Sequence, residues 1–358
     1  MMKIRLTIGI KDNRYLDKLS GFLELNHLDR LELATFSGAD AFLKYAEEGE
    51  TDVFLMSDDL GIAPSVLAGK GKVIILCDEI DSTENESEVV KISKYKKPEL
   101  IFKDILAAFA ETGHSSTQKQ GSHRSGSATR VIMSTSFSGG TGASVFAAAF
   151  AKRLAASASK VLYLSFSPLG ESCTFFQSES ENSFGEVIFA IKSKNIDLGT
   201  KMEAVVNEDN GVSFFSSAKN AMDMLELSAE DKKVIVSTLV ASGKYEYIIL
   251  DENFELSEAF VQLMSLCDRI ILVNNGEKTA NQKFVRTKSA LAVMEKMYKV
   301  SVLDKMCLIY NRFSSSCSSE KIEHPEMAVL GTIPPVTHAT LSQVIEFIQN
   351  RDDVFENI

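Results

Sequence analysis

The chain has 358 residues, of which 45% are hydrophobic and 24% charged, values typical of globular proteins with room for two domains. Acidic residues (49 Asp and Glu) outnumber basic ones (38 Lys and Arg), and the formal net charge of −11 argues against general binding to nucleic acid or anionic membranes. No apolar run reaches the length of about 18 residues that membrane insertion needs, and the five cysteines lack the paired spacing of zinc sites, so we expect a cytoplasmic protein with reduced thiols.

A change of composition divides the chain. Residues 112–129 read TGHSSTQKQGSHRSGSAT, without one large apolar side chain. Such a segment cannot bury enough surface to offset its ordering entropy, which predicts a flexible Ser/Gly linker. The expected domains are therefore residues 1–111 and residues 130–358.

The first domain alternates short apolar runs with amphipathic segments. Strands are expected at 3–10, 31–36, 52–57, 72–77 and 88–93, and helices at 14–25, 39–48 and 98–111. The middle strands are nearly continuous apolar runs, as in a parallel sheet covered on both faces. The pattern predicts a doubly wound, flavodoxin-like α/β domain of five strands.

This order of elements resembles the receiver domain of two-component signalling. Receivers carry a phosphorylatable Asp at the end of the third strand, where this chain has Ser57, and a Thr or Ser after the fourth, where it has Cys77. A lysine is kept as Lys94 or Lys97. Asp58, one position late, is either a solvated turn residue or a shifted phosphosite, and we favour the turn. The domain is expected to serve as an interaction module without phosphorylation.

The second domain opens with an apolar strand at 131–135, a Ser/Gly loop and an Ala-rich helix at 142–156. This order suits anion binding, because glycines let backbone amides surround a phosphate at a helix N-terminus. The loop FSGGTGAS resembles the deviant Walker A loop of the ParA/MinD class, KGGxGK[ST], with both lysines replaced. The expected nucleotide contacts are Ser138, Gly139, Gly140, Thr141, Gly142, Ala143, Ser144 and Val145, with Ser144 also on magnesium. The alternative is an ordinary Gly-rich turn.

Acidic positions of the same class come next in the chain. YEYIILDE ends an apolar strand at Asp251, which matches the Walker B position and predicts a second magnesium contact. A turn or helix N-cap role for Asp251 remains the alternative. Ser165 and Ser167 stand where the class has a DxD motif. Catalysis of phosphoryl transfer depends on positioning and electrostatic stabilisation. The absence of the DxD acids and of both lysines therefore predicts slow or absent hydrolysis.

Two later segments match the part of the class that binds the base. MCLIYNRF places Asn311 and Arg312 directly after a buried strand, and an Asn amide can pair with the purine edge. VLGTIPPV places Pro334 and Pro335 where a loop packs on adenine. Asn311 as a turn former and the two prolines as a rigid loop are the simpler interpretations.

A receiver-like domain followed by a lysine-poor ParA/MinD-type P-loop domain with a mostly parallel sheet resembles the TadZ/CpaE proteins of tight-adherence (Tad/Flp) pilus assembly. The resemblance implies a cytoplasmic homodimer, with the cell pole as a candidate location, that binds ATP and Mg²⁺. It also implies a scaffold or localisation role whose partner is a pilus secretion ATPase or a polar landmark protein.

Other functions of the superfamily fit less well. A DNA-partition ATPase needs both lysines and a basic surface. A membrane switch needs a basic amphipathic C-terminal helix, whereas LSQVIEFIQNRDDVFENI is acidic. The remaining alternative is an active ATPase switch that positions another cargo and draws its phosphate-binding charge from other cations, with Lys152 and Arg153 as candidates.

Overall fold

The structure is a computed structural model, and contacts divide the chain into two compact units. The first unit comprises residues 1–121 with 189–205, and the second comprises 122–188 with 206–358. The described residues are 3–78, 89–112, 129–170, 172–178, 180, 182–193, 196–314 and 319–356. Residues 113–128 of the predicted linker lie outside them, so the limits of the linker stay a prediction.

The first unit contains the predicted five-stranded parallel sheet, with strand order β2-β1-β3-β4-β5. Its strands are β1 (Ile4–Gly9), β2 (Leu31–Phe36), β3 (Val53–Ser57), β4 (Lys72–Cys77) and β5 (Val89–Ser93). This order is that of flavodoxin-like folds. All five residues of β3 are buried, as the continuous apolar run predicts for a central strand.

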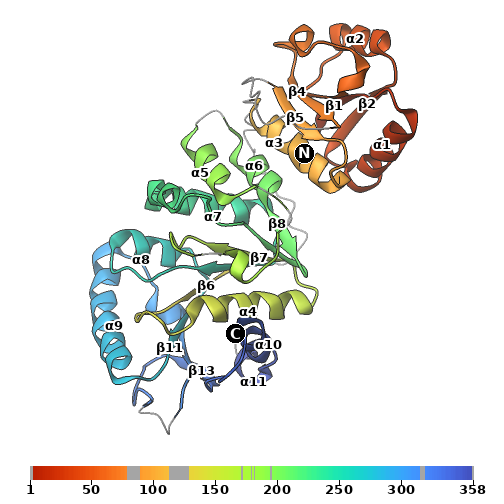
Figure 1. Cartoon of the computed structure of the whole chain (residues 1–358). Coiled ribbons are helices and arrows are strands. Elements are labelled where there is room, and N and C mark those ends of the chain that lie inside the picture. The colour runs from red at the N-terminus through yellow and green to blue at the C-terminus, as the bar shows by residue number, and fades with distance from the viewer. Residues whose placement is uncertain are drawn as a thin grey trace. The chain divides into compact units, whose positions relative to one another are not determined.

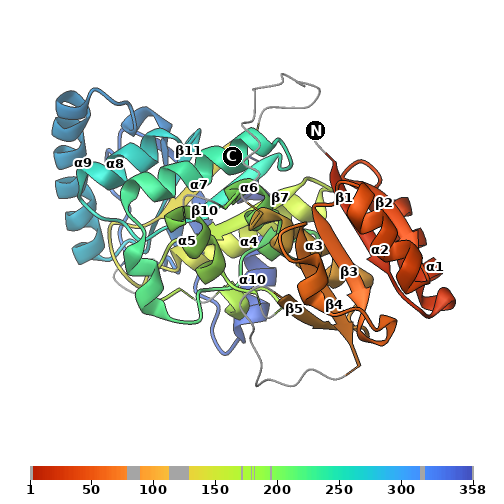
Figure 2. The same cartoon turned by 90° about the horizontal axis from the view of Figure 1, so that it is seen from above.

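Helices cover both faces of this sheet (Figure 2). They are α1 (Asn13–His27), α2 (Ala39–Glu48) and α3 (Pro98–Ala110). Asp12 caps α1, because its side chain accepts hydrogen bonds from the backbone N–H groups of Arg14 and Tyr15. Pro98 begins α3, where its missing N–H has no helical partner to lose. The predicted helices are thus confirmed.

The first unit also includes a helix from later in the chain. Helix α6 (Leu198–Val205) packs on α3, and the backbone N–H of Asp197 donates to the carbonyl of Ala110 at 3.2 Å. Arg30 and Glu203 form an ion pair at 2.8 Å. The division drawn from the sequence places this segment in the second domain, whereas its contacts place it in the first unit.

The second unit is built on an eight-stranded sheet in the order β13-β12-β11-β6-β10-β7-β9-β8. The strands are β6 (Arg130–Thr135), β7 (Val161–Ser165), β8 (Asn207–Asp209), β9 (Val212–Phe214), β10 (Tyr247–Asp251), β11 (Arg269–Asn274), β12 (Met306–Asn311) and β13 (Ala328–Ile333). Only β8 pairs antiparallel in this sheet, at its edge. The predicted mostly parallel sheet is confirmed, and the carboxyl ends of its central strands meet at one edge.

Helices lie on both faces of this sheet, with α4 and α10 on one side and α7 and α8 on the other (Figure 1). The helices are α4 (Ala143–Ala156), α5 (Phe184–Lys192), α7 (Ala229–Ser242), α8 (Glu258–Ser265), α9 (Lys278–Tyr298), α10 (Leu341–Gln349) and α11 (Asp352–Phe355). Short 3-10 helices are η1 (Asp58–Leu60), η2 (Pro64–Leu67), η3 (Ser172–Thr174), η4 (Ala221–Glu226) and η5 (Leu303–Lys305).

Helix α4 lies against the centre of the sheet and is buried from Phe146 to Ala151. Ala147, Ala148 and Ala149 are fully buried in the same cluster as Ile132 and Ile249 of the strands above them. Because protein interiors are close-packed, a larger side chain at one of these alanines would force its neighbours to move.

We expect Ala148→Leu to lower the free energy of unfolding by about 1–3 kcal/mol, because added methylenes overpack a filled core. Urea unfolding followed by far-ultraviolet circular dichroism measures the change. Ala156→Leu is the matched control, because Ala156 is exposed at the end of the same helix. Equal unfolding midpoints for the two variants would contradict this account of the packing.

Candidate functional site

The loop between β6 and α4 needs glycine at two positions. Gly140 has φ +77° and Gly142, the N-cap of α4, has φ +87°, a region that residues with a Cβ rarely adopt. A Cβ on Gly142 would lie 2.5 Å from Nδ2 of Asn311, whereas a Cβ on Gly139 or Gly140 would meet nothing within 4 Å. The loop is therefore packed at its helix end and open at Gly139 and Gly140.

The end of β12 reaches this loop directly. Nδ2 of Asn311 donates to the carbonyl of Thr141 at 2.8 Å, and Nη1 of Arg312 donates to the carbonyl of Gly140 at 3.3 Å. Asn311 is buried, while Arg312 is exposed and has φ +56°. The structure thus brings the two predicted base-binding residues to the predicted phosphate loop, 170 residues earlier in the chain.

The Walker B candidate meets the start of α4. Oγ of Ser144 donates to Oδ1 of Asp251 at 3.0 Å, and the hydroxyl of Tyr163 donates to Oδ2 at 2.7 Å. Asp251 is only 4% exposed. Burial raises the pKa of its carboxyl group, while the hydrogen bonds from Tyr163, Ser144 and Ser165 oppose that shift by stabilising the charged form.

The positions at which the ParA/MinD-type motifs have lysines or acids carry neutral side chains in this chain. The backbone N–H of Ser138 donates to Oγ of Ser136 at 3.1 Å, and the carbonyl of Ser138 accepts from the same hydroxyl at 2.8 Å. Ala143 begins α4. Ser167 accepts from Nδ2 of Asn253 at 2.8 Å, and its N–H donates to Oγ of Ser165 at 3.3 Å. The two lysine positions of the motif and the two acid positions of DxD therefore all carry uncharged side chains.

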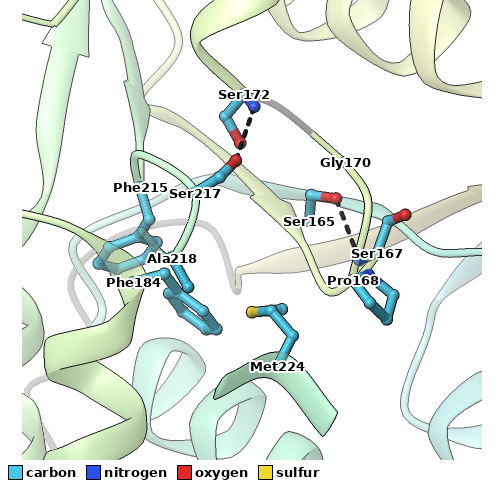
Figure 3. A pocket seen from close by; sticks show the side chains of 10 residues that line it. All are labelled: Ser165, Ser167, Pro168, Gly170, Ser172, Phe184, Phe215, Ser217, Ala218 and Met224. Carbon is cyan, nitrogen blue, oxygen red and sulfur yellow. Dashed lines mark hydrogen bonds between the residues drawn. The ribbon is translucent and has the colours of Figure 1, made fainter. Parts of the chain in front are cut away.

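A small cavity occupies the place next to these serines (Figure 3). Its lining consists of Ser165, Ser167, Pro168, Gly170, Ser172, Phe184, Phe215, Ser217, Ala218 and Met224, none of which is charged. Its volume of about 10 Å³ is near the lower limit for one water molecule. Among the described residues, the carboxyl end of β7 is therefore lined by hydroxyl groups and carries no charged side chain.

The two candidate cations of α4 point away from the loop. Nζ of Lys152 lies 5.2 Å from the ring centre of Phe176, and Arg153 forms an ion pair with Asp352. These contacts hold both side chains at the far end of the helix. Among the cations that the sequence singles out, Arg312 is the one that contacts the loop.

Pro334 and Pro335 are exposed and directly follow β13. The backbone N–H of Phe313 donates to the carbonyl of Ile333 at 2.9 Å, which joins the loops after β12 and β13. The prolines are thus placed by their strand beside the loop of Asn311. Whether they contact a base stays a prediction.

Sequence reasoning missed an aromatic cluster at the loop. The ring of Phe137 lies 4.6 Å from that of Phe254, which follows β10, and 5.9 Å from that of Phe284 on α9. Phe137 stands where the Walker A pattern has its first glycine, and that departure was the available signal. Tyr163 was also missed, although the two-residue period of a strand places it on the same face as Ser165.

The equivalent edge of the first unit lacks an acceptor carboxylate at the end of β3. Ser57 is buried there and donates to Oδ1 of Asp59 at 2.5 Å. Lys94 pairs with Asp78, whose Oδ1 also accepts from the hydroxyl of Tyr95 at 3.0 Å. The hydrogen bond from Lys94 lowers the pKa of Asp78. No cluster of three potential metal ligands occurs among the described residues.

Comparison with known families identifies this unit. Residues 2–110 match the family model described as "TadZ-like, receiver domain". The N-terminal domain is therefore similar to TadZ-like receiver domains. No curated protein matches the chain.

The remainder of the chain has the fold of ParA/MinD-type ATPases. A ParA family ATPase from Chlorobium tepidum TLS superimposes with a TM-score of 0.51 at 19% identity, over 64% of this chain and 95% of that protein. The cell division ATPase MinD from Pyrococcus furiosus gives a TM-score of 0.48 at 15% identity, over 64% and 99%. The covered share of this chain equals that of residues 130–358. At such identities the likeness to the ParA family ATPase concerns the fold alone. A TadZ-like receiver domain joined to this fold is consistent with the predicted TadZ/CpaE-like protein.

Within the part of the chain that the structure describes, no helix is both long enough and apolar enough to cross a membrane.

The residue after Asp251 in the ParA/MinD-type domain is also a buried acid. Glu252 is 6% exposed, its Oε1 lies 3.2 Å from Nζ of Lys232, and its Oε2 has no hydrogen-bond partner among the described residues. Nζ of Lys232 lies 5.3 Å from the ring centre of Phe166. Burial raises the pKa of Glu252 to about 7, and the nearby Lys232 opposes the shift.

We expect Glu252 to make stability fall as pH rises. In the unfolded chain the group loses its proton near pH 4.5, while the folded protein keeps it to about pH 7. The folded state binds more protons in this window, so raising the pH through it lowers the free energy of unfolding, by about 3 kcal/mol at most. Glu252→Gln should remove this part of the slope in urea unfolding measured at about pH 5 and about pH 8.

Glu246→Gln is the control, because Glu246 is an exposed carboxyl group just before β10 and is not among the groups that shift the pKa of Glu252. The assignment would be wrong if Glu252→Gln and Glu246→Gln showed the same pH dependence as the unchanged protein.

Proposed function

We propose that the chain is a nucleotide-binding, dimeric scaffold of Tad/Flp pilus assembly, in which the ParA/MinD-type domain binds ATP with Mg²⁺ and hydrolyses it slowly or not at all. The observation that carries the proposal is the hydrogen bond between Ser144 and Asp251 at the foot of the glycine loop. A hydroxyl and a carboxylate placed together at a helix N-terminus form an oxygen donor set suited to Mg²⁺. ATP binding by the purified protein tests it.

The residues of the site fit a bound nucleotide. The loop is open at Gly139 and Gly140, and the buried hydroxyl of Thr141 has no hydrogen-bond partner among the described residues. Backbone amides of residues 138–145 would hold the phosphates, and Ser144 and Asp251 would hold Mg²⁺. Asn311, Arg312, Pro334 and Pro335 would contact the base. The metal would supply positive charge at the phosphates when bound.

The neutral residues of the site support slow turnover. Ser138 and Ala143 offer no charge to the transition state, and the described residues that line the cavity beside Ser165 and Ser167 include no acid to orient a water molecule. Backbone amides bind a ground-state phosphate, whereas acceleration needs charge stabilisation that strengthens in the transition state. The absence of the motif's lysines and acids therefore weakens ATP binding less than it slows ATP hydrolysis.

The TadZ-like receiver domain supports the assignment to pilus assembly. With Ser57 at the acceptor position and Lys94 paired with Asp78, the domain acts as a recruiting surface that needs no phosphorylation. Its partner is a pilus secretion ATPase or a polar landmark protein, and the complex works in the cytoplasm at a cell pole. Homodimers form with the nucleotide sites facing one another, and a ligand that binds only the dimer stabilises it.

One observation favours a second function, an active ATPase switch for another cargo. The guanidinium of Arg312 donates to the carbonyl of Gly140 at 3.3 Å, which places one cation beside the loop. A single arginine near transferred phosphate is the kind of group that accelerates hydrolysis in other P-loop enzymes. The rate of turnover separates the two functions.

We expect saturable binding of ATP in the presence of magnesium, and Gly142→Arg should abolish it. The new side chain would collide with Asn311 and fill the loop. Isothermal titration calorimetry measures binding, and light scattering on the same samples should report a dimer. Gly21→Arg is the matched control, because a Cβ at Gly21 in α1 meets nothing within 4 Å. Absence of heat for the unchanged protein would end the proposal of a nucleotide site.

We expect ATP turnover well below about 1 per second, the lower end of usual enzyme rates. The double change Ser138→Lys with Ala143→Lys should raise it, because it returns two cations to the loop. Phosphate release by the purified protein is the measurement. Turnover near that rate that is lost in Arg312→Gln would favour the active switch instead.

A further inference from the structure

Tyr163 makes an unusual contact for a residue in the middle of a buried strand. It is 1% exposed on β7, and its ring packs 5.0 Å from the ring of Phe176 in the core of the ParA/MinD-type domain. Its hydroxyl group donates to Oδ2 of Asp251 at 2.7 Å. A buried Tyr hydroxyl usually finds a hydrogen-bond partner, and here that partner is the carboxylate of the Walker B candidate. The side chain therefore makes a polar contact in addition to its packing.

Strand register explains how the contact arises. Strands β7 and β10 are parallel neighbours, and Ser165 lies opposite Asp251 while Tyr163 lies opposite Ile249. Tyr163 and Ser165 share a face, so the longer Tyr side chain extends along the strand to the carboxylate. Ser144 reaches the other carboxylate oxygen from α4. Each oxygen of Asp251 is therefore held by a hydroxyl from a different element.

Orientation matters at this carboxylate. The terminal torsion of an Asp side chain has a broad, two-fold preference, so donors on both oxygens are what define its plane. Magnesium demands nearly ideal octahedral geometry. With Ser138 and Ala143 in place of lysines, a metal ion held by Ser144 and Asp251 would supply positive charge to the phosphates in addition to Arg312.

We propose that Tyr163 is a positioning residue for magnesium-dependent nucleotide binding, which acts by holding Oδ2 of Asp251 so that Oδ1 stays with Ser144 and faces the metal. The inference rests on the proposed function, since it assigns a role toward the magnesium nucleotide. It adds a residue that neither the motif of the loop nor the Walker B strand contains.

Tyr163→Phe tests the proposal in the full-length protein. The change keeps the ring that packs against Phe176 and removes only the hydroxyl, and circular dichroism would check that the variant is folded. We expect the affinity for ATP with magnesium to fall about 10- to 100-fold, the usual effect of losing a hydrogen bond to a metal-binding side chain. The affinity for ATP in EDTA should stay unchanged.

A double-mutant cycle with Asp251→Asn shows whether Tyr163 acts through the carboxylate. In the Asp251→Asn background, Tyr163→Phe should cause no further loss of magnesium-dependent affinity, because the carboxylate that would bind the metal is already gone. Tyr15→Phe is the matched control, since the hydroxyl of Tyr15 also donates at 2.7 Å, to the carbonyl of Lys94 in the receiver domain.

The outcomes separate the two proposals. Equal loss of affinity with magnesium and with EDTA would mean a structural role for Tyr163, and no loss of affinity in either condition would also overturn the inference. In both cases the proposed nucleotide site stands. A wild-type protein that binds no ATP would overturn the proposed function and this inference together.

Discussion

The hydrogen bond from Ser144 to Asp251 joins the two segments on which the candidate site depends. Ser144 is in the first turn of α4, and Asp251 ends a strand more than 100 residues later. The contact forms because β6 and β10 are adjacent and parallel, so that the loop after one strand faces the end of the other. Helix α4 packs against both strands, and its first turn thereby meets the acid.

Few charged side chains surround this hydrogen bond among the described residues. The arrangement of these charges supports the proposed function. Asp251 and Glu252 are both buried, and burial raises the pKa of each. Glu252 has Lys232 as its counter-ion, whereas Asp251 is stabilised by hydroxyl groups. A carboxylate whose hydrogen-bond donors are uncharged has no counter-ion and can still bind a cation. This fits a site that binds a magnesium nucleotide. The same neutrality leaves little with which to speed its hydrolysis.

The two domains are similar in the residues at the carboxyl ends of their strands, where both have uncharged side chains at motif positions. Each is a parallel sheet whose carboxyl ends form one edge, where ligands of such folds bind. In the TadZ-like receiver domain the acceptor position is Ser57 and the lysine is paired internally with Asp78. In the ParA/MinD-type domain the lysines and the DxD acids are replaced by Ser138, Ala143, Ser165 and Ser167. Both edges therefore have uncharged residues at positions where the corresponding motifs have catalytic groups, in line with the proposed scaffold function.

The sequence by itself determined the strands and helices of the first domain, and the strand, glycine loop and helix that open the second domain, because continuous apolar runs and glycine positions act locally. It also indicated Ser144, Asp251 and Asn311 through their places after buried strands. Only the tertiary structure showed that the amide of Asn311 holds the carbonyl of Thr141, and that the hydroxyl of Tyr163 meets Asp251. Those contacts depend on strand order and register across the sheet, which arise from packing between segments distant in the chain and leave no local pattern.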